Sequence, residues 1–165
     1  GTTPSTFSPN VVVPRWQMAL FLVRQARVHG VAVPPPVDHG FTDIDAFDQA
    51  TRDAINQLAS LGITTGTSPT TFSPNDQVSR WQMAIFLVRL SIRVGIPVPT
   101  VPPDAGFVDI SGLDEPTQTA INQLAAINIT KGTSATDFSP DLAVTRWQMA
   151  IFLTRVLQVD GVVPT

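Results

Sequence analysis

One ten-residue phrase, Arg80-Trp-Gln-Met-Ala-Ile-Phe-Leu-Val-Arg89, decides the fold because the chain repeats it almost unchanged. Closely similar copies occupy residues 15–24 and 146–155, so the phrase recurs after 65 and then 66 residues. Such a fixed period is typical of a tandem repeat. Apolar residues cover most of the circumference of each predicted helix, which indicates burial against several neighbours. The phrase therefore predicts three equivalent buried helices, each of which begins at an arginine.

The composition is that of a folded protein. Hydrophobic residues make up 43% of the 165 residues and the mean hydropathy is +0.17, which excludes a disordered chain. The net charge of −3 argues against nucleic-acid binding, because that function normally needs a broad basic face. No apolar run approaches the roughly 20 residues that span a bilayer, so we expect no membrane insertion. Cysteine is absent, which excludes disulfides and thiolate metal sites.

A loop rich in glycine, proline and hydroxyl residues precedes each phrase. In the second copy it runs from Gly66 to Pro74, and equivalent loops occupy residues 1–9 and 132–140. Because the first repeat is present only from this loop onward, we expect the chain to be a piece of a longer protein. Each buried helix is predicted to end at a glycine in the left-handed conformation, fifteen residues past its arginine, at Gly30, Gly95 and Gly161.

A second phrase recurs between the buried helices. Phe41-Thr-Asp43-Ile44 and Phe107-Val-Asp109-Ile110 each lead into a predicted amphipathic helix, near residues 46–61 and 114–127. Strand signals are nearly absent, so the sequence predicts an all-α fold of five helices. Equivalent apolar surfaces prefer equivalent neighbours, and the simplest arrangement is a pseudo-threefold assembly with a central three-helix bundle and loop-rich prongs.

The sequence gives little support for an enzyme or a metal site. His29 and His39 flank a single proline-rich connector, which does not suit a Ser-His triad. Asp43 and Asp109 recur at equivalent positions, so they indicate separate sites rather than one acid–base pair. The loop of residues 137–141 lacks the ligand spacing of an EF-hand and is better explained as a turn. We therefore expect no catalytic residue, no cofactor and no metal.

The arginine that opens each phrase is the strongest candidate for a binding residue. At a helix amino terminus beside a glycine-rich loop it makes a compact anion site, and its planar fork matches a carboxylate. The alternative is a salt bridge to Asp43 or Asp109 that holds the loop to the helix, and both can be true. Farther along the second copy, Gln82, Arg89 and Arg93 form a separate polar stripe that we expect to be solvated. The tryptophan after each arginine either stacks on a sugar or fills the core.

In their order, these phrases resemble the S-layer homology family. The pattern is Phe-x-Asp-Ile, a helix with Ala-Ile, Gly-Ile-x-x-Gly, Phe-x-Pro and then Ser/Thr-Arg before an apolar helix. Residues 41–95 carry it in full, residues 107–161 carry it with Asn128 for the first glycine, and residues 1–30 carry its second half. The resemblance implies three modules in one compact domain: 1–33 (the second half of module 1), 34–98 and 99–165.

The resemblance implies a three-pronged assembly that anchors a bacterial surface protein non-covalently to the cell wall. The partner would be a secondary cell-wall polysaccharide attached to peptidoglycan, often with a pyruvylated, anionic sugar, bound in grooves between modules. It also implies an extracellular location, with a signal peptide upstream of residue 1. The alternative is a self-assembly element of a surface layer or filament, in which a neighbouring copy of the chain completes the first module.

The family's Thr-Arg-Ala-Glu motif carries the binding arginine, although Trp-Gln replaces Ala-Glu in this chain. The family's Phe-x-Asp carboxylate corresponds to Asp43 and Asp109, and its loop glycine corresponds to Gly1, Gly66 and Gly132. The candidate carbohydrate-binding set is completed by Arg15, Arg80 and Arg146 with their neighbours Trp16, Trp81 and Trp147.

Overall fold

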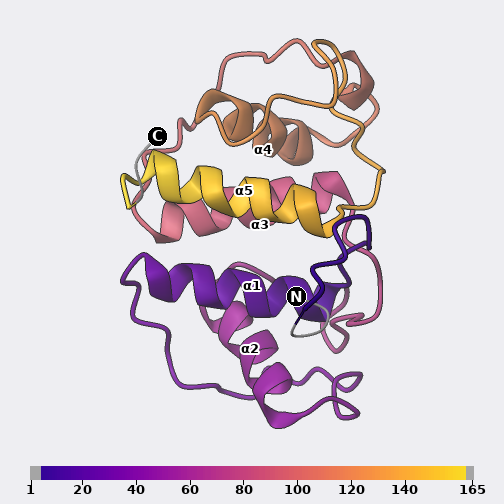
Figure 1. Cartoon of the computed structure of the whole chain (residues 1–165), viewed down its shortest axis with the longest axis vertical. Helices are drawn as coiled ribbons and strands as arrows, with labels where there is room; N and C mark the ends of the chain where they lie inside the picture. Colours follow the sequence, from indigo (N-terminus) through magenta and orange to yellow (C-terminus); the bar gives the residue numbers. More distant parts are fainter. Residues whose placement is uncertain (1–4, 163–165) are drawn as a thin grey trace. The chain divides into compact units, whose positions relative to one another are not determined.

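The computed structural model describes residues 5–162, in which α-helices are joined by loops (Figure 1). Within these residues β-structure is limited to isolated bridges, so the predicted all-α fold is confirmed. A short 3-10 helix, Val108–Ile110, contains Asp109 and precedes the fourth α-helix. The α-helices in chain order are α1 (Arg15–Val28), α2 (Gln49–Ser60), α3 (Arg80–Arg93), α4 (Glu115–Ala126) and α5 (Arg146–Val159).

The three long helices begin at the repeat arginines, as the sequence predicts, whereas α2 begins at Gln49, a few residues after the predicted start near residue 46. In α3 the Ser79 hydroxyl accepts from the Gln82 amide (3.4 Å), while the Gln82 side chain accepts from the Ser79 amide (3.2 Å), which is a capping box. Glycines with positive φ follow the three buried helices, and α4 ends before Asn128 at φ +61°. Since these residues tolerate the left-handed conformation, they stop each helix without strain.

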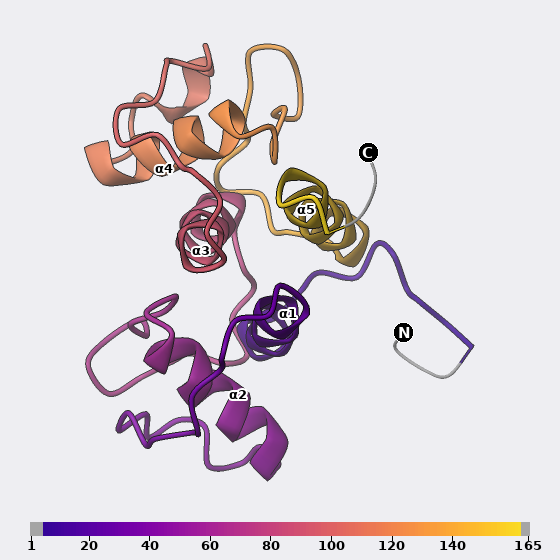
Figure 2. The ribbon, with the colours of Figure 1, turned by 90° about the vertical axis from the view of Figure 1, so that its left-hand side faces the viewer.

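The chain divides into two compact units, one of residues 14–77 and one that joins residues 78–162 to residues 5–13. In the first unit α2 packs across α1, and in the second unit α4 packs across α3. Figure 2 shows α1 and α3 nearly end-on. Each outer helix buries an isoleucine and a leucine in its unit, Ile55 with Leu58 and Ile121 with Leu124. This apolar stripe follows from their amphipathic sequences.

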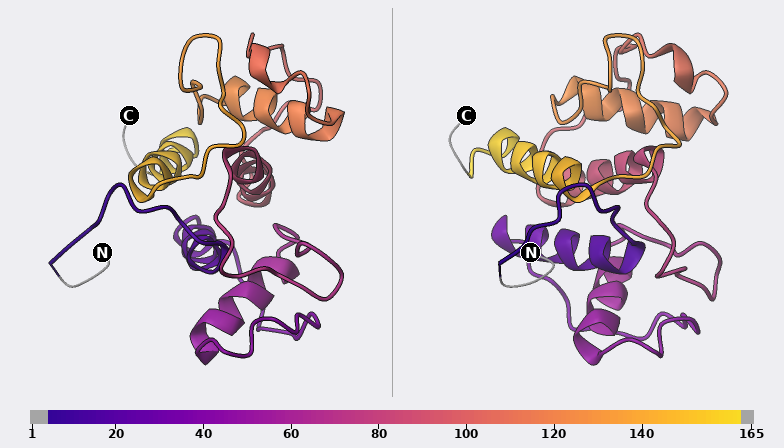
Figure 3. Two further views of the ribbon diagram at one scale, coloured as in Figure 1. Left: turned by 90° about the vertical axis from the view of Figure 1, so that its right-hand side faces the viewer. Right: turned by 45° about the vertical axis from the view of Figure 1, so that its right-hand side comes forward.

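The second unit contains a closed ring of backbone hydrogen bonds between three valines that each lie two residues before a repeat arginine. Val13 N donates to Val144 O (2.8 Å), Val144 N donates to Val78 O (2.8 Å), and Val78 N donates to Val13 O (3.1 Å). All three side chains are fully buried. Through this ring the amino-terminal segment reaches the start of α5 (Figure 3), where Trp147 N donates to Pro9 O. The central three-helix bundle stays a prediction.

The two outer helices carry aspartate caps that should make stability depend on pH. Asp48 accepts from the Thr51 amide and Asp114 from the Thr117 amide, each at 2.8 Å. Hydrogen bonds from Thr51 and from Thr117 hold the pKa of each carboxyl below its ordinary value of 3.8. Because the folded pKa is the lower one, the stabilisation is present above the unfolded pKa and is lost as the pH falls through the folded pKa.

We expect the double variant Asp48→Asn, Asp114→Asn to keep its caps, since Asn caps as well as Asp, but to lose the pH dependence they carry. Its melting temperature, measured by circular dichroism, should fall less than that of the wild type between about pH 5 and about pH 3. Asp45→Asn is the matched control, because Asp45 caps no helix. An equal acid-induced fall in the double variant and the wild type would contradict this assignment.

Candidate functional site

Each repeat arginine is buried at the start of its helix and is held by the loop of another repeat. Arg80, for example, is only 3% exposed. Its Nε donates to the carbonyl of Phe138 (2.7 Å), and its guanidinium lies over the ring of the same residue, 4.7 Å from the centroid. Such a stacked cation gains cation–π attraction. The equivalent pairs are Arg15 with Phe72 (2.8 Å) and Arg146 with Phe7 (2.8 Å).

The aspartate of each Phe-x-Asp-Ile phrase holds the same loop from its other side. Asp109 accepts from the amides of Phe138 (2.8 Å) and Ser139 (2.6 Å). Arg80 and Asp109 therefore bind the two ends of one peptide group, the Phe138 carbonyl and the Ser139 N–H. Asp43 accepts from the equivalent amides of the first unit, at 2.9 and 2.7 Å. In place of the predicted salt bridge, the hydrogen bonds of Arg80 and Asp109 connect the two residues through the loop backbone.

Burial is the main influence on the pKa of Arg15 and of Arg80. It lowers the pKa of Arg80, and the negative charge of Asp109 partly offsets this effect. Burial lowers the pKa of Arg15 in the same way. The negative charges of Asp76 and Asp43 act in the opposite direction and raise it. A guanidinium nevertheless stays protonated at neutral pH. Each repeat thus places a permanent positive charge where water has little access, and such a charge needs hydrogen-bond acceptors.

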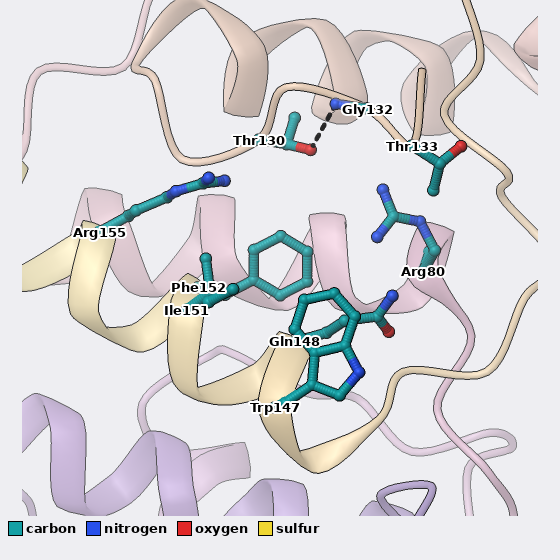
Figure 4. Close-up of a pocket in the computed structure, with 9 residues that line it drawn as sticks. All are labelled: Arg80, Thr130, Gly132, Thr133, Trp147, Gln148, Ile151, Phe152 and Arg155. Atoms are coloured by element: carbon teal, nitrogen blue, oxygen red, sulfur yellow. Dashed lines mark hydrogen bonds between the residues drawn. The ribbon is translucent and has the colours of Figure 1, made fainter. Parts of the chain in front are cut away.

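Arg80 forms one wall of a groove of about 430 Å³ in the second unit (Figure 4). Its Nη2 atom is buried and has no hydrogen-bond partner among the described residues. The α5 side of the groove carries a second cation, Arg155, whose Nη1 donates to Ile129 O (3.0 Å). The remaining lining residues are Thr130, Gly132 and Thr133 from the loop, and Trp147, Gln148, Ile151 and Phe152 from α5.

The groove offers different chemistry on its different walls. The two arginines supply donors for an anionic or hydroxyl-bearing ligand. Trp147, which is 44% exposed, and Ile151 supply an apolar surface beside them. An arginine fork next to an aromatic ring suits a sugar that carries a carboxylate, because polar edges and apolar faces are both matched.

The loop glycine has a steric reason to be there. Gly132 has φ +74°, and a Cβ atom would lie 2.5 Å from Asp137 O and 2.6 Å from the Phe107 ring. Gly66 is in the same position, where a Cβ atom would lie 2.5 Å from Thr71 O. Only glycine therefore lets the loop turn tightly beneath the phenylalanine of the Phe-x-Asp-Ile phrase. The third predicted glycine, Gly1, lies outside the described residues.

The structure brings some of the predicted residues together and separates others. Arg80, Gly132 and Trp147 line one groove, while Asp109 is not among its lining residues and acts on the loop backbone. The three tryptophans are not equivalent. Trp16 is half-buried against Phe47, with ring centroids 6.0 Å apart, and Trp81 is also half-buried, whereas the indole of Trp147 borders the groove (Figure 4).

Sequence reasoning missed the six lining residues other than Arg80, Gly132 and Trp147. Two of these six, Gln148 and Arg155, are polar side chains of α5. They are the third-copy equivalents of Gln82 and Arg89, which the periodicity assigns to a solvated stripe. The Gln148 side chain also accepts from the Thr145 amide (3.0 Å), so the helix cap fixes its position at the groove. The sequence signal that could have identified Arg155 is its recurrence, because an arginine ends all three copies of the phrase.

Comparison with known proteins agrees with this architecture. The family model of the S-layer homology domain matches residues 40–84 and 106–150, which together make up more than half of the chain. The chain therefore belongs to the S-layer homology domain family and carries two tandem matches. Both run from the Phe-x-Asp-Ile phrase into the following buried helix, so Arg80 and Arg146 lie within them. The predicted module boundaries stay predictions.

The family gives the coarse function. S-layer homology domains are non-catalytic binding domains known for anchoring to the cell wall, and they belong to proteins of the cell surface or cell wall. A search of curated proteins found no match. Over residues 5–162, none of the helices combines the length and the apolarity that a membrane span requires.

Gly132→Ala should destabilise the chain by about 2 kcal/mol or more, because it forces a side chain into a left-handed position and against the loop backbone. Gly112→Ala is the matched control, since nothing lies within 4 Å of its would-be Cβ atom; its effect should stay within about 0.5 kcal/mol. Urea denaturation gives the free energy of unfolding of both variants. Equal losses would contradict the steric role of Gly132.

Proposed function

We propose that this chain anchors a bacterial surface protein to the cell wall by binding the anionic, pyruvylated sugars of a secondary cell-wall polysaccharide. The observation that carries the proposal is the buried, unpartnered Nη2 of Arg80 at the wall of the groove. A buried polar group without a partner is rare in a native protein, and a missing ligand is one of its ordinary causes. The carboxylate of a pyruvyl group supplies the acceptor that Arg80 lacks.

The other groove residues have complementary roles in this proposal. Trp147 and Ile151 pack against the apolar face of the sugar and the pyruvyl methyl group. Thr133 and Gln148 meet its hydroxyl groups, and Arg155 attracts a second negative charge along the polymer. Gly132 and Asp109 act indirectly, because they hold the loop that completes the groove.

The repeat extends this role to the other arginines. We assign an equivalent anion-binding role to Arg15 and Arg146, which are buried over Phe72 and Phe7 as Arg80 is over Phe138. Gly66 and Asp43 shape the loop that holds Arg15. Several weak sites on one chain that bind one long polymer give avidity without any further contact.

The direct test is retention of the purified chain on cell walls with and without their attached polymer. We expect Arg80→Ala to weaken retention about tenfold or more, as loss of a charge-assisted hydrogen bond predicts, and Arg80→Ala with Arg146→Ala to weaken it further. Arg93→Ala is the matched control, because Arg93 is an exposed arginine of α3 outside the groove. Unchanged retention by the double variant would contradict the proposal.

Two further arms separate binding from folding. Arg80 also holds the Phe138 carbonyl, so its loss loosens the loop as well. Trp147→Ala and Arg155→Ala remove other groove contacts and should weaken retention while the melting temperature changes little. Mild acid releases pyruvyl ketals from the polymer, and this treatment should abolish retention of the wild type. Full retention on depyruvylated walls would contradict the assigned ligand.

A further inference from the structure

A second hollow lies in the first unit, where the connector before the Phe-x-Asp-Ile phrase meets helix α2. Its volume is about 390 Å³, which is within the range of small-molecule binding sites. All of its lining residues lie between positions 36 and 56, and none of them belongs to the groove of Arg80. We call this cavity, lined by residues 36–56, the α2 hollow.

One wall of the α2 hollow carries buried donors that have no acceptor. Asn56 is only 9% exposed, and its Oδ1 accepts from the His39 amide (3.2 Å). The two hydrogens on its Nδ2 have no acceptor among residues 5–162. Arg52 Nη2 donates to Gln49 Oε1 (2.7 Å), but Arg52 Nε is buried without a partner among the same residues. Because buried donors are normally paired, this wall favours a ligand that supplies acceptor oxygens.

Carboxylates and apolar side chains line the rest of the α2 hollow. Asp38, Asp45 and Asp53 contribute acceptors, and an ionised carboxylate donates no hydrogen bond. Phe41 and Ile44 are buried and contribute apolar surface. A hydroxyl group both donates and accepts, so the neighbouring hydroxyls of a sugar can pair with the donors and with the carboxylates at once.

The charges of the α2 hollow disfavour other classes of ligand. Three carboxylates and one guanidinium line it, which is a formal net charge of −2 and repels an anion. A simple amine would suit the carboxylates, but an ammonium group cannot accept a hydrogen bond from Asn56. Over the described residues, no three His, Asp or Glu side chains are arranged to hold a metal ion. An uncharged, hydroxyl-rich ligand is the class that remains.

Helix α4 keeps the frame of this hollow but has different chemistry. Ala105 N donates to Asn122 Oδ1 (3.1 Å), just as His39 N donates to Asn56 Oδ1. The positions equivalent to Asp45, Arg52 and Asp53 are uncharged: Ser111, Gln118 and Thr119. The charged set is therefore a property of the first unit and not of the repeat.

We propose that the α2 hollow binds an uncharged sugar unit, a hexose or an N-acetylhexosamine, independently of the groove of Arg80. Asn56 and Arg52 donate to oxygen atoms of the sugar, and the carboxylates accept from its hydroxyl groups. The apolar face of the sugar ring packs against Phe41. The chain then has two carbohydrate sites of opposite electrostatic character, one for an anionic sugar and one for a neutral sugar.

The test is a titration of the ¹⁵N-labelled chain with uncharged hexoses and N-acetylhexosamines, followed by amide shifts in NMR spectra. We expect at least one of these sugars to shift amides of residues 36–56 and to leave those of the equivalent residues 102–122 unchanged. Glucuronate should bind about tenfold or more weakly, because its carboxylate is repelled. The amine 1,5-diaminopentane, which has no hydroxyl groups, should also bind about tenfold or more weakly, because it leaves Asn56 unpaired.

Matched variants locate the sugar in the hollow. The triple variant Asp45→Ser, Arg52→Gln, Asp53→Thr takes the residues that α4 and the loop before it already carry, and it should weaken binding about tenfold or more. Asp45→Ala removes one exposed carboxylate and should weaken binding without changing the melting temperature. Asp141→Asn, which alters an exposed carboxylate of the second unit, is the control and should bind as the wild type does.

Three results would overturn the proposal: no shift within residues 36–56 with any uncharged sugar, tighter binding of glucuronate or 1,5-diaminopentane than of every uncharged sugar, or equal binding by the triple variant and the wild type. Retention through the groove of Arg80 is measured with other variants, so each proposal can fail without the other.

Discussion

The guanidinium of Arg80 keeps its charge although it is almost fully buried. Several other residues of the repeat stabilise this buried charge. Burial of a cation is unfavourable unless acceptors replace the lost water. The Phe138 carbonyl supplies one acceptor and the Phe138 ring a second favourable contact. Asp109 then fixes the loop that presents both, and Gly132 lets that loop turn tightly enough to reach the helix. One Nη atom has no partner among the described residues, so the same arrangement that stabilises the repeat leaves a donor for the proposed ligand.

Near-identity in sequence does not give the three copies identical surroundings. The tryptophan of the phrase is half-buried against Phe47 at Trp16 but is exposed beside the groove at Trp147. The helix residues are nearly the same, and the difference lies in what packs on them from elsewhere in the chain. The ring of hydrogen bonds between Val13, Val78 and Val144 shows the opposite case, because there three equivalent backbones meet each other directly and their environments match. The surroundings of the three copies are therefore equivalent at the valine ring and different around the tryptophan.

The sequence predicted the features that depend on local rules. The capping box at Ser79, the helix stop at Asn128 and the tight turn at Gly132 each follow from the conformational preferences of a few adjacent residues. The groove was predicted only in part. Arg155 of α5 lines the same groove as Arg80 of α3, and periodicity along one helix cannot reveal which other element faces its polar stripe. The exposure of Ala150 had no local signal, because Ala84 in a nearly identical phrase is buried.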